Sequence, residues 1–360
     1  MTWDPAFWNG RSVLITGHTG FKGAWLALWL LQLGAQVHGL ALAAEGERNL
    51  YADLALETAY PGQFIARIVD LRDPLAAASA VQDAAPSVVI HLAAQALVRR
   101  SYADPIGTWS TNLMGSLHLL EALKPLQQHC AVVMVTTDKV YANQEWIHGY
   151  RELDPLGGHD PYSASKAGAE IAIASWRDSF CGQAPHQVSH LAIATARAGN
   201  VIGGGDWAED RIVPDAIRAC AKGEPIALRR PQATRPWQHV LEPLGAYLLL
   251  AEALSRDPLA HAEAWNFGPA LESSRSVHQL IETLHGHWHG SWFDASDPAD
   301  PHEAGLLHLA IDKAWHQLAW RPRWCFETAV ARTARWYRQV EEGASPLACC
   351  QSDLAAYLEA

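Results

Sequence analysis

The chain has 360 residues, of which 49% are hydrophobic and 18% are charged, and its formal net charge is −11. A single core usually stops growing at about 250–300 residues, so we expect one large domain and a smaller one. The apolar content excludes a disordered chain, and the acidic balance argues against general nucleic-acid binding. The six cysteines fit neither a disulfide framework nor a zinc site. We find no signal-peptide pattern and no membrane-spanning apolar run, and we expect a cytoplasmic protein.

Apolar runs typical of buried strands alternate with helical patterns in the first half of the chain. The strands are expected at Ser12–Thr16, Gln36–Ala41, Phe64–Val69, Val88–Leu92, Ala131–Thr137 and Leu191–Ala196. Continuous apolar strands separated by helices, such as Ala24–Leu33, predict a parallel sheet that is covered on both faces. The fold class is therefore α/β, with a Rossmann-type doubly wound sheet.

The sequence pattern changes after about Asn200, where strands become short and Gly, Pro, Trp and Arg become frequent. Helical patterns return at Pro214–Lys222, Pro243–Arg256, Val277–Leu284 and Phe326–Glu342. We expect a dinucleotide-binding domain over residues 1–196. Residues 197–360 would form mainly a smaller α/β substrate-binding domain, with some segments returning to the first domain. The tail after Gly343 is expected to form a short helix.

A glycine-rich loop follows the first strand directly and leads into a helix. Its sequence is GHTGFKG, and the expected cofactor contacts are Gly17, Thr19, Gly20, Phe21 and Gly23. Glycines allow a tight turn and a close approach to a pyrophosphate, while the helix N-terminus offers free N–H groups. The spacing alone is weak evidence. Its position after the first strand of an alternating pattern predicts dinucleotide binding.

The residues after the second and third strands bear on the adenosine end of the cofactor. An acidic residue after the second strand would favour NAD, but that strand ends without one, and Glu45, Glu47 and Arg48 follow only later. This rule therefore leaves NAD and NADP open. Asp70 and Leu71 follow the third strand and are candidate contacts of the adenine ring. The alternative is that Asp70 only caps the next helix.

Tyr162 and Lys166 form a YxxxK pattern within the sequence DPYSASK. Positions i and i+4 share one face of a helix, so Lys166 is expected to lie near the Tyr162 phenol and to lower its pKa. A phenol with a lowered pKa can take a proton from a sugar hydroxyl near neutral pH. The pattern is common by chance, but here it follows a strand that ends in the segment Thr136–Tyr141. Together these features predict oxidation of a sugar hydroxyl.

The order of these motifs resembles the extended short-chain dehydrogenase/reductase family and, in detail, its branch of CDP-glucose 4,6-dehydratases. The resemblance covers the first strand to about Pro243, with WNFGP at Trp265–Pro269, and the last ninety or so residues carry little of it. The motifs that carry it are GHTGFKG (Gly17–Gly23), HLAAQ (His91–Gln95), TTDKVY (Thr136–Tyr141), PYSASKA (Pro161–Ala167), RAGNVIGGGDWAEDRIVPD (Arg197–Asp215) and RPWQHVLEP (Arg235–Pro243).

This resemblance implies NAD as cofactor and a conversion of CDP-glucose to its 4-keto-6-deoxy product. The C4 hydroxyl is oxidised, water is lost across C5 and C6, and the hydride returns to C6. Tyr162 would take the C4 hydroxyl proton, Thr137 would orient the C4 oxygen, and Lys166 would also bind the nicotinamide ribose. Asp138 would protonate the departing C6 hydroxyl, which requires a raised pKa. Lys139 would be the C5 base; the alternative is that it only holds a phosphate or polarises the ketone.

Further contacts are implied on the cofactor and substrate sides. Ala93, Ala94 and Gln95 of HLAAQ would contact the cofactor, and Gln95 and Thr137 also the substrate. Arginines suit bidentate contact with a pyrophosphate. The remaining substrate-binding candidates are Asn200, Trp207, Arg211, Arg235 and His239, and core packing is the alternative role of each Trp.

Several alternatives remain open on the sequence alone. One is a nucleotide-sugar C4 epimerase, which needs the Tyr–Lys pair but not Asp138 and Lys139. Another is a dehydratase that acts on a different nucleotide sugar. A non-catalytic Rossmann protein would be expected to lack Tyr162 or Lys166. The segment His285–His289 (HGHWH) has no supporting ligands, and we expect no metal. By analogy with the family, we expect a homodimer formed by the helices at Ile106–Leu123 and Tyr162–Phe180.

Overall fold

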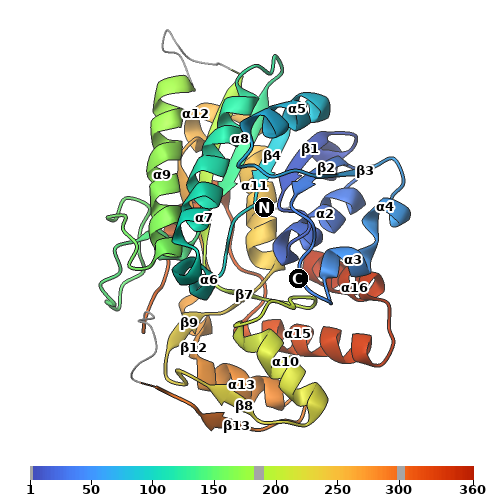
Figure 1. Cartoon of the computed structure of the whole chain (residues 1–360), viewed down its shortest axis with the longest axis vertical. Coiled ribbons are helices and arrows are strands. Elements are labelled where there is room, and N and C mark those ends of the chain that lie inside the picture. The colour runs from blue at the N-terminus through green and yellow to red at the C-terminus, as the bar shows by residue number, and fades with distance from the viewer. Residues whose placement is uncertain (1–2, 182–189, 298–304) are drawn as a thin grey trace.

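The computed structural model describes residues 3–181, 190–297 and 305–360, and it is built around one seven-stranded sheet (Figure 1). All paired strands of this sheet are parallel, in the order β11-β6-β5-β4-β1-β2-β3. The strands are β1 (Ser12–Thr16), β2 (Gln36–Ala41), β3 (Phe64–Ile68), β4 (Val88–His91), β5 (Cys130–Val135), β6 (Leu191–Ala198) and β11 (Ala264–Phe267). This confirms the Rossmann-type fold. The strand order reverses between β1 and β4, where open α/β sheets form their binding crevice.

Both faces of the sheet are buried, which explains the continuous apolar strands. In β1, Val13 and Ile15 face one core and Leu14 faces the other. Three helices cover the Leu14 side: α5 (Pro74–Ala84), α8 (Gly115–Leu123) and α9 (Pro161–Phe180). The opposite side is covered mainly by α2 (Phe21–Gln32), α11 (Leu241–Arg256) and α16 (Pro346–Glu359).

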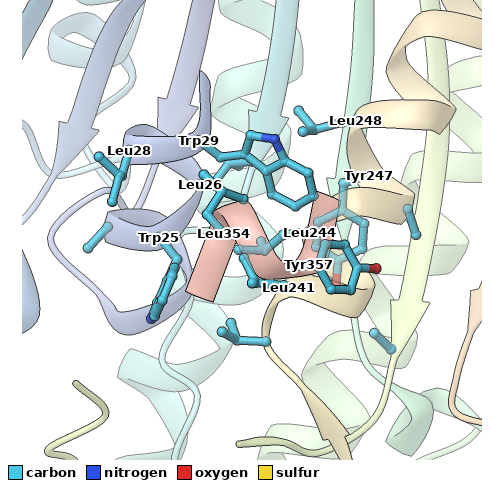
Figure 2. Packing of buried hydrophobic residues seen from close by; sticks show 14 of the residues in the cluster. Trp25, Leu26, Leu28, Trp29, Leu241, Leu244, Tyr247, Leu248, Leu354 and Tyr357 are labelled. Carbon is cyan, nitrogen blue, oxygen red and sulfur yellow. The ribbon is translucent and has the colours of Figure 1, made fainter. Parts of the chain in front are cut away.

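The larger core joins the two ends of the chain. Figure 2 shows Trp29 of α2 near Tyr247 of α11 and Tyr357 of α16, and the ring centres of Trp29 and Tyr357 are 5.8 Å apart. The expected tail helix is therefore α16, and it is part of the central core. Its buried tyrosine fixes the last helix against the same aromatic cluster that covers the sheet.

The second half of the chain forms a lobe at the bottom of Figure 1. It contains α10 (Ile212–Lys222), α13 (Val277–His285) and α15 (Phe326–Glu341). Its small sheets pair β8 (Ile226–Leu228) with β13 (Trp292–Asp294), β9 (Thr234–Pro236) with β12 (Ser274–Ser276), and β7 (Val201–Ile202) with β10 (Gln238–His239). Because α11, β11 and α16 pack with the main sheet, parts of residues 197–360 belong to the first lobe. A division near residue 196 stays a proposal.

The remaining elements are short and connect these layers. They are α1 (Pro5–Trp8), α3 (Leu50–Leu54), α4 (Leu56–Ala59), α6 (Val98–Ala103), α7 (Pro105–Trp109), the π-helical turn η1 (Ser110–Met114), the 3₁₀ turn η2 (Asp138–Val140), α12 (Pro258–His261), the 3₁₀ turn η3 (Leu271–Ser273) and α14 (Asp312–Leu318). Within the described ranges, no helix has the length and apolar character needed to cross a membrane.

Candidate active site

A large cleft lies at the carboxyl ends of the strands, between the sheet and the lower lobe. Its volume is about 2270 Å³, whereas a pocket for one small ligand usually has about 300–1,000 Å³. The cleft can therefore hold a dinucleotide together with a nucleotide sugar. Every site residue proposed from the sequence lines it except His239.

The glycine loop has the geometry of a pyrophosphate cradle. Gly17 has φ +80°, and a Cβ there would lie 2.8 Å from the backbone N of Ala93. A Cβ on Gly23 would lie 2.1 Å from the Gly17 carbonyl oxygen. Gly20 precedes α2 and supplies no side-chain cap, so the first N–H groups of this helix remain available. These observations fit a dinucleotide, whose phosphates need close backbone approach.

The loop after β2 carries charged residues that already have partners. The Glu45 carboxylate is 2.9 Å from the Arg100 guanidinium. The Arg48 guanidinium lies 3.6 Å from the centre of the Trp207 ring and 2.6 Å from the Glu341 carboxylate. Arg48 thus ties the adenosine end of the cleft to the lower lobe.

The segment after β3 resolves one of the alternatives for Asp70. Asp73 caps α5 by accepting from the N–H groups of residues 75 and 76, so Asp70 is not that cap. Asp70 instead forms an ion pair with Arg72 at 2.6 Å. Arg72 therefore holds the pKa of Asp70 below its usual range. Asp70 and Leu71 both line the cleft, and adenine contact stays a proposal.

The turn after β5 places Asp138 at the floor of the cleft. Its carboxylate is 3% exposed and accepts a hydrogen bond of 3.0 Å from the Thr137 hydroxyl. A Cβ on Gly199 would lie 2.8 Å from Asp138 Oδ2, so the neighbouring strand closes over the acid. Burial raises the pKa of Asp138, although Lys139 and Arg235 oppose the shift. A raised pKa is what a general acid requires.

The Tyr–Lys pair comes from the first turns of α9, which Asp160 caps. Tyr162 is hydrogen-bonded to the Thr137 side chain, and Lys166 Nζ donates to the Val135 carbonyl at 3.1 Å. The expectation that Lys166 lowers the Tyr162 pKa is wrong for this structure. Burial raises that pKa to about 12, because the desolvated phenolate is disfavoured more than its neighbours can offset.

Lys139 and Lys166 have different surroundings in the site. Lys139 is half-buried on η2, with its ammonium 6.0 Å from the ring centre. Burial lowers the pKa of Lys166 to about 8, and the Glu170 carboxylate opposes this shift. Two lysines and a buried acid therefore surround the position where a sugar hydroxyl would meet Tyr162.

Two arginines expected on the substrate side lie close to this catalytic group. Arg211 forms an ion pair of 2.9 Å with Asp206, and its charge acts on Tyr162. The charge of Arg235, on β9, lowers the pKa of Asp138. Asn200 is half-buried in the cleft wall.

The two aromatic substrate candidates lie differently. Trp207 lines the cleft, but Arg48 covers its ring, and its edge packs on Tyr337 with ring centres 5.0 Å apart. His239 is 0% exposed and lies between the rings of Trp25 and Trp324. The proposal that His239 binds substrate is therefore wrong, because aromatic packing separates it from the cleft.

Sequence reasoning missed two residues of this site. Lys22 of the glycine loop lines the cleft near Asp138, Lys166 and Arg211, and burial lowers its pKa to about 8. Lys22 could have been predicted as a site residue because it lies within the glycine-rich motif GHTGFKG. The second is Asn112, which is buried in the π-helical turn η1.

The Asn112 side chain fixes the HLAAQ loop to α9. Its Oδ1 accepts from the Gln95 N–H at 2.9 Å, and its Nδ2 donates to the Gln95 carbonyl and the Ser165 hydroxyl. No sequence pattern announces a π turn, although such turns often occur at functional sites. Among the described residues, no group of three or more His, Cys, Asp or Glu side chains is arranged to hold a metal ion.

Comparison with known proteins identifies the family. The sequence profile described as GDP-mannose 4,6 dehydratase matches residues 14–333. The chain belongs to this family of nucleotide-sugar dehydratases. It is also 42% identical over 359 residues to the CDP-glucose 4,6-dehydratase of Salmonella typhimurium, covering 99% of each chain. This confirms the resemblance to the CDP-glucose branch.

Solved structures agree with this family in fold. DesIV, a dTDP-glucose 4,6-dehydratase from Streptomyces venezuelae with NAD bound, matches with a TM-score of 0.75 and 24% identity, covering 93% of this chain and 99% of that one. A UDP-glucose 4-epimerase from Thermotoga maritima matches with a TM-score of 0.75 and 20% identity, covering 91% and 99%. At these identities the likeness shows the fold alone. The family is shown by the sequence profile and by the full-length relative.

Proposed function

We propose that this protein is an NAD-dependent CDP-glucose 4,6-dehydratase, which forms CDP-4-keto-6-deoxyglucose and water. The observation that carries the proposal is a buried acid beside the Tyr162–Lys166 pair. Asp138 lies hydrogen-bonded to Thr137, which itself contacts Tyr162. A C4 epimerase needs the Tyr162–Lys166 pair but has no use for this acid. The full-length similarity to a CDP-glucose enzyme supports the choice of substrate.

The chain's residues hold the cofactor at both ends of the cleft. The cradle of Gly17, Gly20 and Gly23 and the N-terminus of α2 would bind the pyrophosphate. Lys166, whose ammonium contacts the carboxyl end of β5, would bind the nicotinamide ribose. When bound, NAD supplies the oxidant that accepts a hydride from C4 and later returns it to C6. The positive nicotinamide ring would also favour the phenolate of Tyr162, whose pKa burial alone raises.

The side chains around Tyr162 divide the proton transfers. Tyr162 takes the proton of the C4 hydroxyl, and Thr137 orients the C4 oxygen. The C4 ketone acidifies the C5–H bond, and Lys139 is placed to take that proton. Asp138 gives its proton to the C6 hydroxyl, which leaves as water while a double bond forms between C5 and C6. When C6 is then reduced, C5 regains a proton and the 4-keto-6-deoxy sugar results.

The substrate's charged part would lie toward the lower lobe. Arg211 and Arg235 reach the cleft from that side and suit a diphosphate. Asn200 and Gln95 would contact the sugar nucleotide from the opposite wall. The preference for cytosine is supported only by the full-length relative.

We also propose a cytoplasmic homodimer. The two helical segments expected to pair lie side by side on one side of Figure 1, as α7, η1 and α8 beside α9. They expose large apolar side chains: Ile106 is 75% exposed and Ile171 is 61% exposed. Light scattering should give the mass of two chains, and Ile171→Glu should yield one chain. A wild-type monomer would contradict the proposal.

Incubation with CDP-glucose and NAD tests the reaction directly. A 4-keto-6-deoxy product, recognised by its alkaline absorbance and by mass loss of one water, is expected. Parallel reactions with dTDP-, UDP- and GDP-glucose test the base preference. A C4-epimerised sugar formed without loss of water would replace the dehydratase by an epimerase.

A further inference from the structure

Glu170 is a buried acid that the proposed reaction does not use. It lies on α9 four residues after Lys166, and its side chain is 3% exposed. Its carboxylate accepts hydrogen bonds from the Thr136 hydroxyl at 2.5 Å, the Thr195 hydroxyl at 2.8 Å and the Arg197 guanidinium at 2.8 Å. A carboxylate with three donors is held in its charged form, and these donors lower the pKa of Glu170.

The partners of Glu170 belong to the segments that carry the catalytic group. Thr136 directly precedes Thr137, and Arg197 lies near the end of β6, shortly before Asn200. Arg197 also donates to the Tyr141 hydroxyl at 2.8 Å, at the end of the turn that holds Asp138. Glu170 therefore joins α9 to the ends of β5 and β6, directly behind the cleft.

Stability alone is a weak reason for this buried pair. Burying two charges has a large desolvation cost, and apolar replacements of similar volume are often neutral or stabilising. A charge that acts on a neighbouring functional group gives a stronger reason. Glu170 lies one helical turn from Lys166 on the same face, and its charge favours the protonated form of that lysine. Burial of Lys166 favours the neutral form instead.

We propose that Glu170 is a positioning residue that keeps Lys166 protonated beside the cleft. The proposal rests on the proposed function, in which Lys166 acts as a cation beside Tyr162 and the cofactor ribose. Lys166 loses this role when it loses its proton, so Glu170 sets the upper pH at which the site works.

Other charged and titratable groups also face this pair. They are Lys22 on α2, His91 on β4, Asp138 on η2, Tyr162 and Arg177 on α9, and Arg197 on β6. Arg197 is the cation paired with Glu170, and Lys22 and Lys166 are like charges that disfavour each other. His91 is buried between the hydroxyls of Thr16 and Ser116, and burial lowers its pKa to about 3, so it stays neutral.

The pH profile of kcat/KM tests the proposal with two variants that remove the Glu170 charge and one that leaves it. Glu170→Gln removes the negative charge and should move the alkaline limb down by about one pH unit or more. Between about pH 7 and about pH 9 its kcat/KM should then fall about tenfold further than that of the wild type. Arg197→Met leaves the buried Glu170 carboxylate without its cation, so Glu170 should take up a proton and the limb should again move down. Thr195→Val is the matched control, since it removes one hydrogen bond and leaves both charges.

A purely structural pair gives a different pattern. All three variants would then lower the melting temperature while their alkaline limbs coincide with that of the wild type, and the proposal would be overturned. NAD binding, followed by tryptophan fluorescence across the same pH range, provides a readout without sugar. It should show the same shifts even if CDP-glucose proves not to be the substrate. If Glu170→Gln does not fold, an unshifted limb in Arg197→Met overturns the proposal by itself.

Discussion

Replacement of Glu242 by Gln tests how a second buried acid affects stability. Glu242 lies at the start of α11 and is 0% exposed. It accepts hydrogen bonds from the backbone N–H groups of Arg323 and Trp324, and from the Tyr357 hydroxyl at 2.8 Å. It thus connects α11 to the loop before α15 and to the last helix. Burial raises its pKa from 4.5 to about 7.

The direction of the pH effect follows from this shift. Between pH 4.5 and about 7, the folded protein holds a proton on Glu242 that the unfolded chain releases. The resulting stabilisation is complete below pH 4.5 and is lost as the pH rises through about 7. Each pKa unit corresponds to about 1.4 kcal/mol, so the 2.5-unit shift corresponds to roughly 3 kcal/mol as an upper bound. Glu242→Gln stays neutral, and its side chain can both accept from the two N–H groups and donate to the tyrosine.

Urea denaturation followed by tryptophan fluorescence measures this effect at a series of pH values. The free energy of unfolding of Glu242→Gln, relative to wild type, should rise by up to about 3 kcal/mol from about pH 4.5 to about pH 8. Glu121→Gln is the control, because its carboxylate lies on the surface in a pair with Lys124. Parallel curves for Glu242→Gln and wild type across this range would refute a buried acid with a raised pKa.

Three further variants separate the steps of the reaction. Tyr162→Phe should lower kcat by about 10²–10⁴-fold while NAD binding persists, and unchanged turnover would exclude Tyr162 as the base. Asp138→Asn should retain C4 oxidation, seen as accumulating reduced nicotinamide absorbance, but lose elimination by a similar factor; undiminished water loss would exclude the acid role. Lys139→Met should abolish exchange of the C5 proton with heavy water, and persistent exchange would leave Lys139 only a binding role.

Local sequence patterns predicted the central sheet well because both faces of each strand are buried. The expected bounds of β1 and β2 agree with the structure, and the expected end of β5 lies two residues later than the observed Val135. The glycine loop was predictable because its turn has few other solutions: a side chain at Gly17 or Gly23 would collide with backbone atoms. The short β11 was not predicted, because four residues after a change in sequence pattern carry little periodicity.

Side-chain environments in the second half were harder to predict because they depend on packing between distant segments. His239 follows an arginine-rich motif, yet two tryptophans from α2 and the loop before α15 enclose it. The Tyr162 pKa shows the same limit. The i,i+4 spacing predicted that Tyr162 and Lys166 share a helix, which is α9, but only the fold shows that the phenol is buried and that the ammonium donates to Val135.

Asp138 shows how the site favours elimination after oxidation. Lys139, Arg235 and Lys22 all act to lower its pKa, so on a surface this carboxyl would be ionised at neutral pH. Burial outweighs these cations, because the anion would have to exist out of water beneath Gly199. The same cations face the cleft, where a diphosphate would bind. A bound diphosphate would offset their charge and weaken their pull on Asp138. Substrate binding would therefore raise the pKa of Asp138 further, so that Asp138 keeps the proton that it gives to the departing C6 hydroxyl.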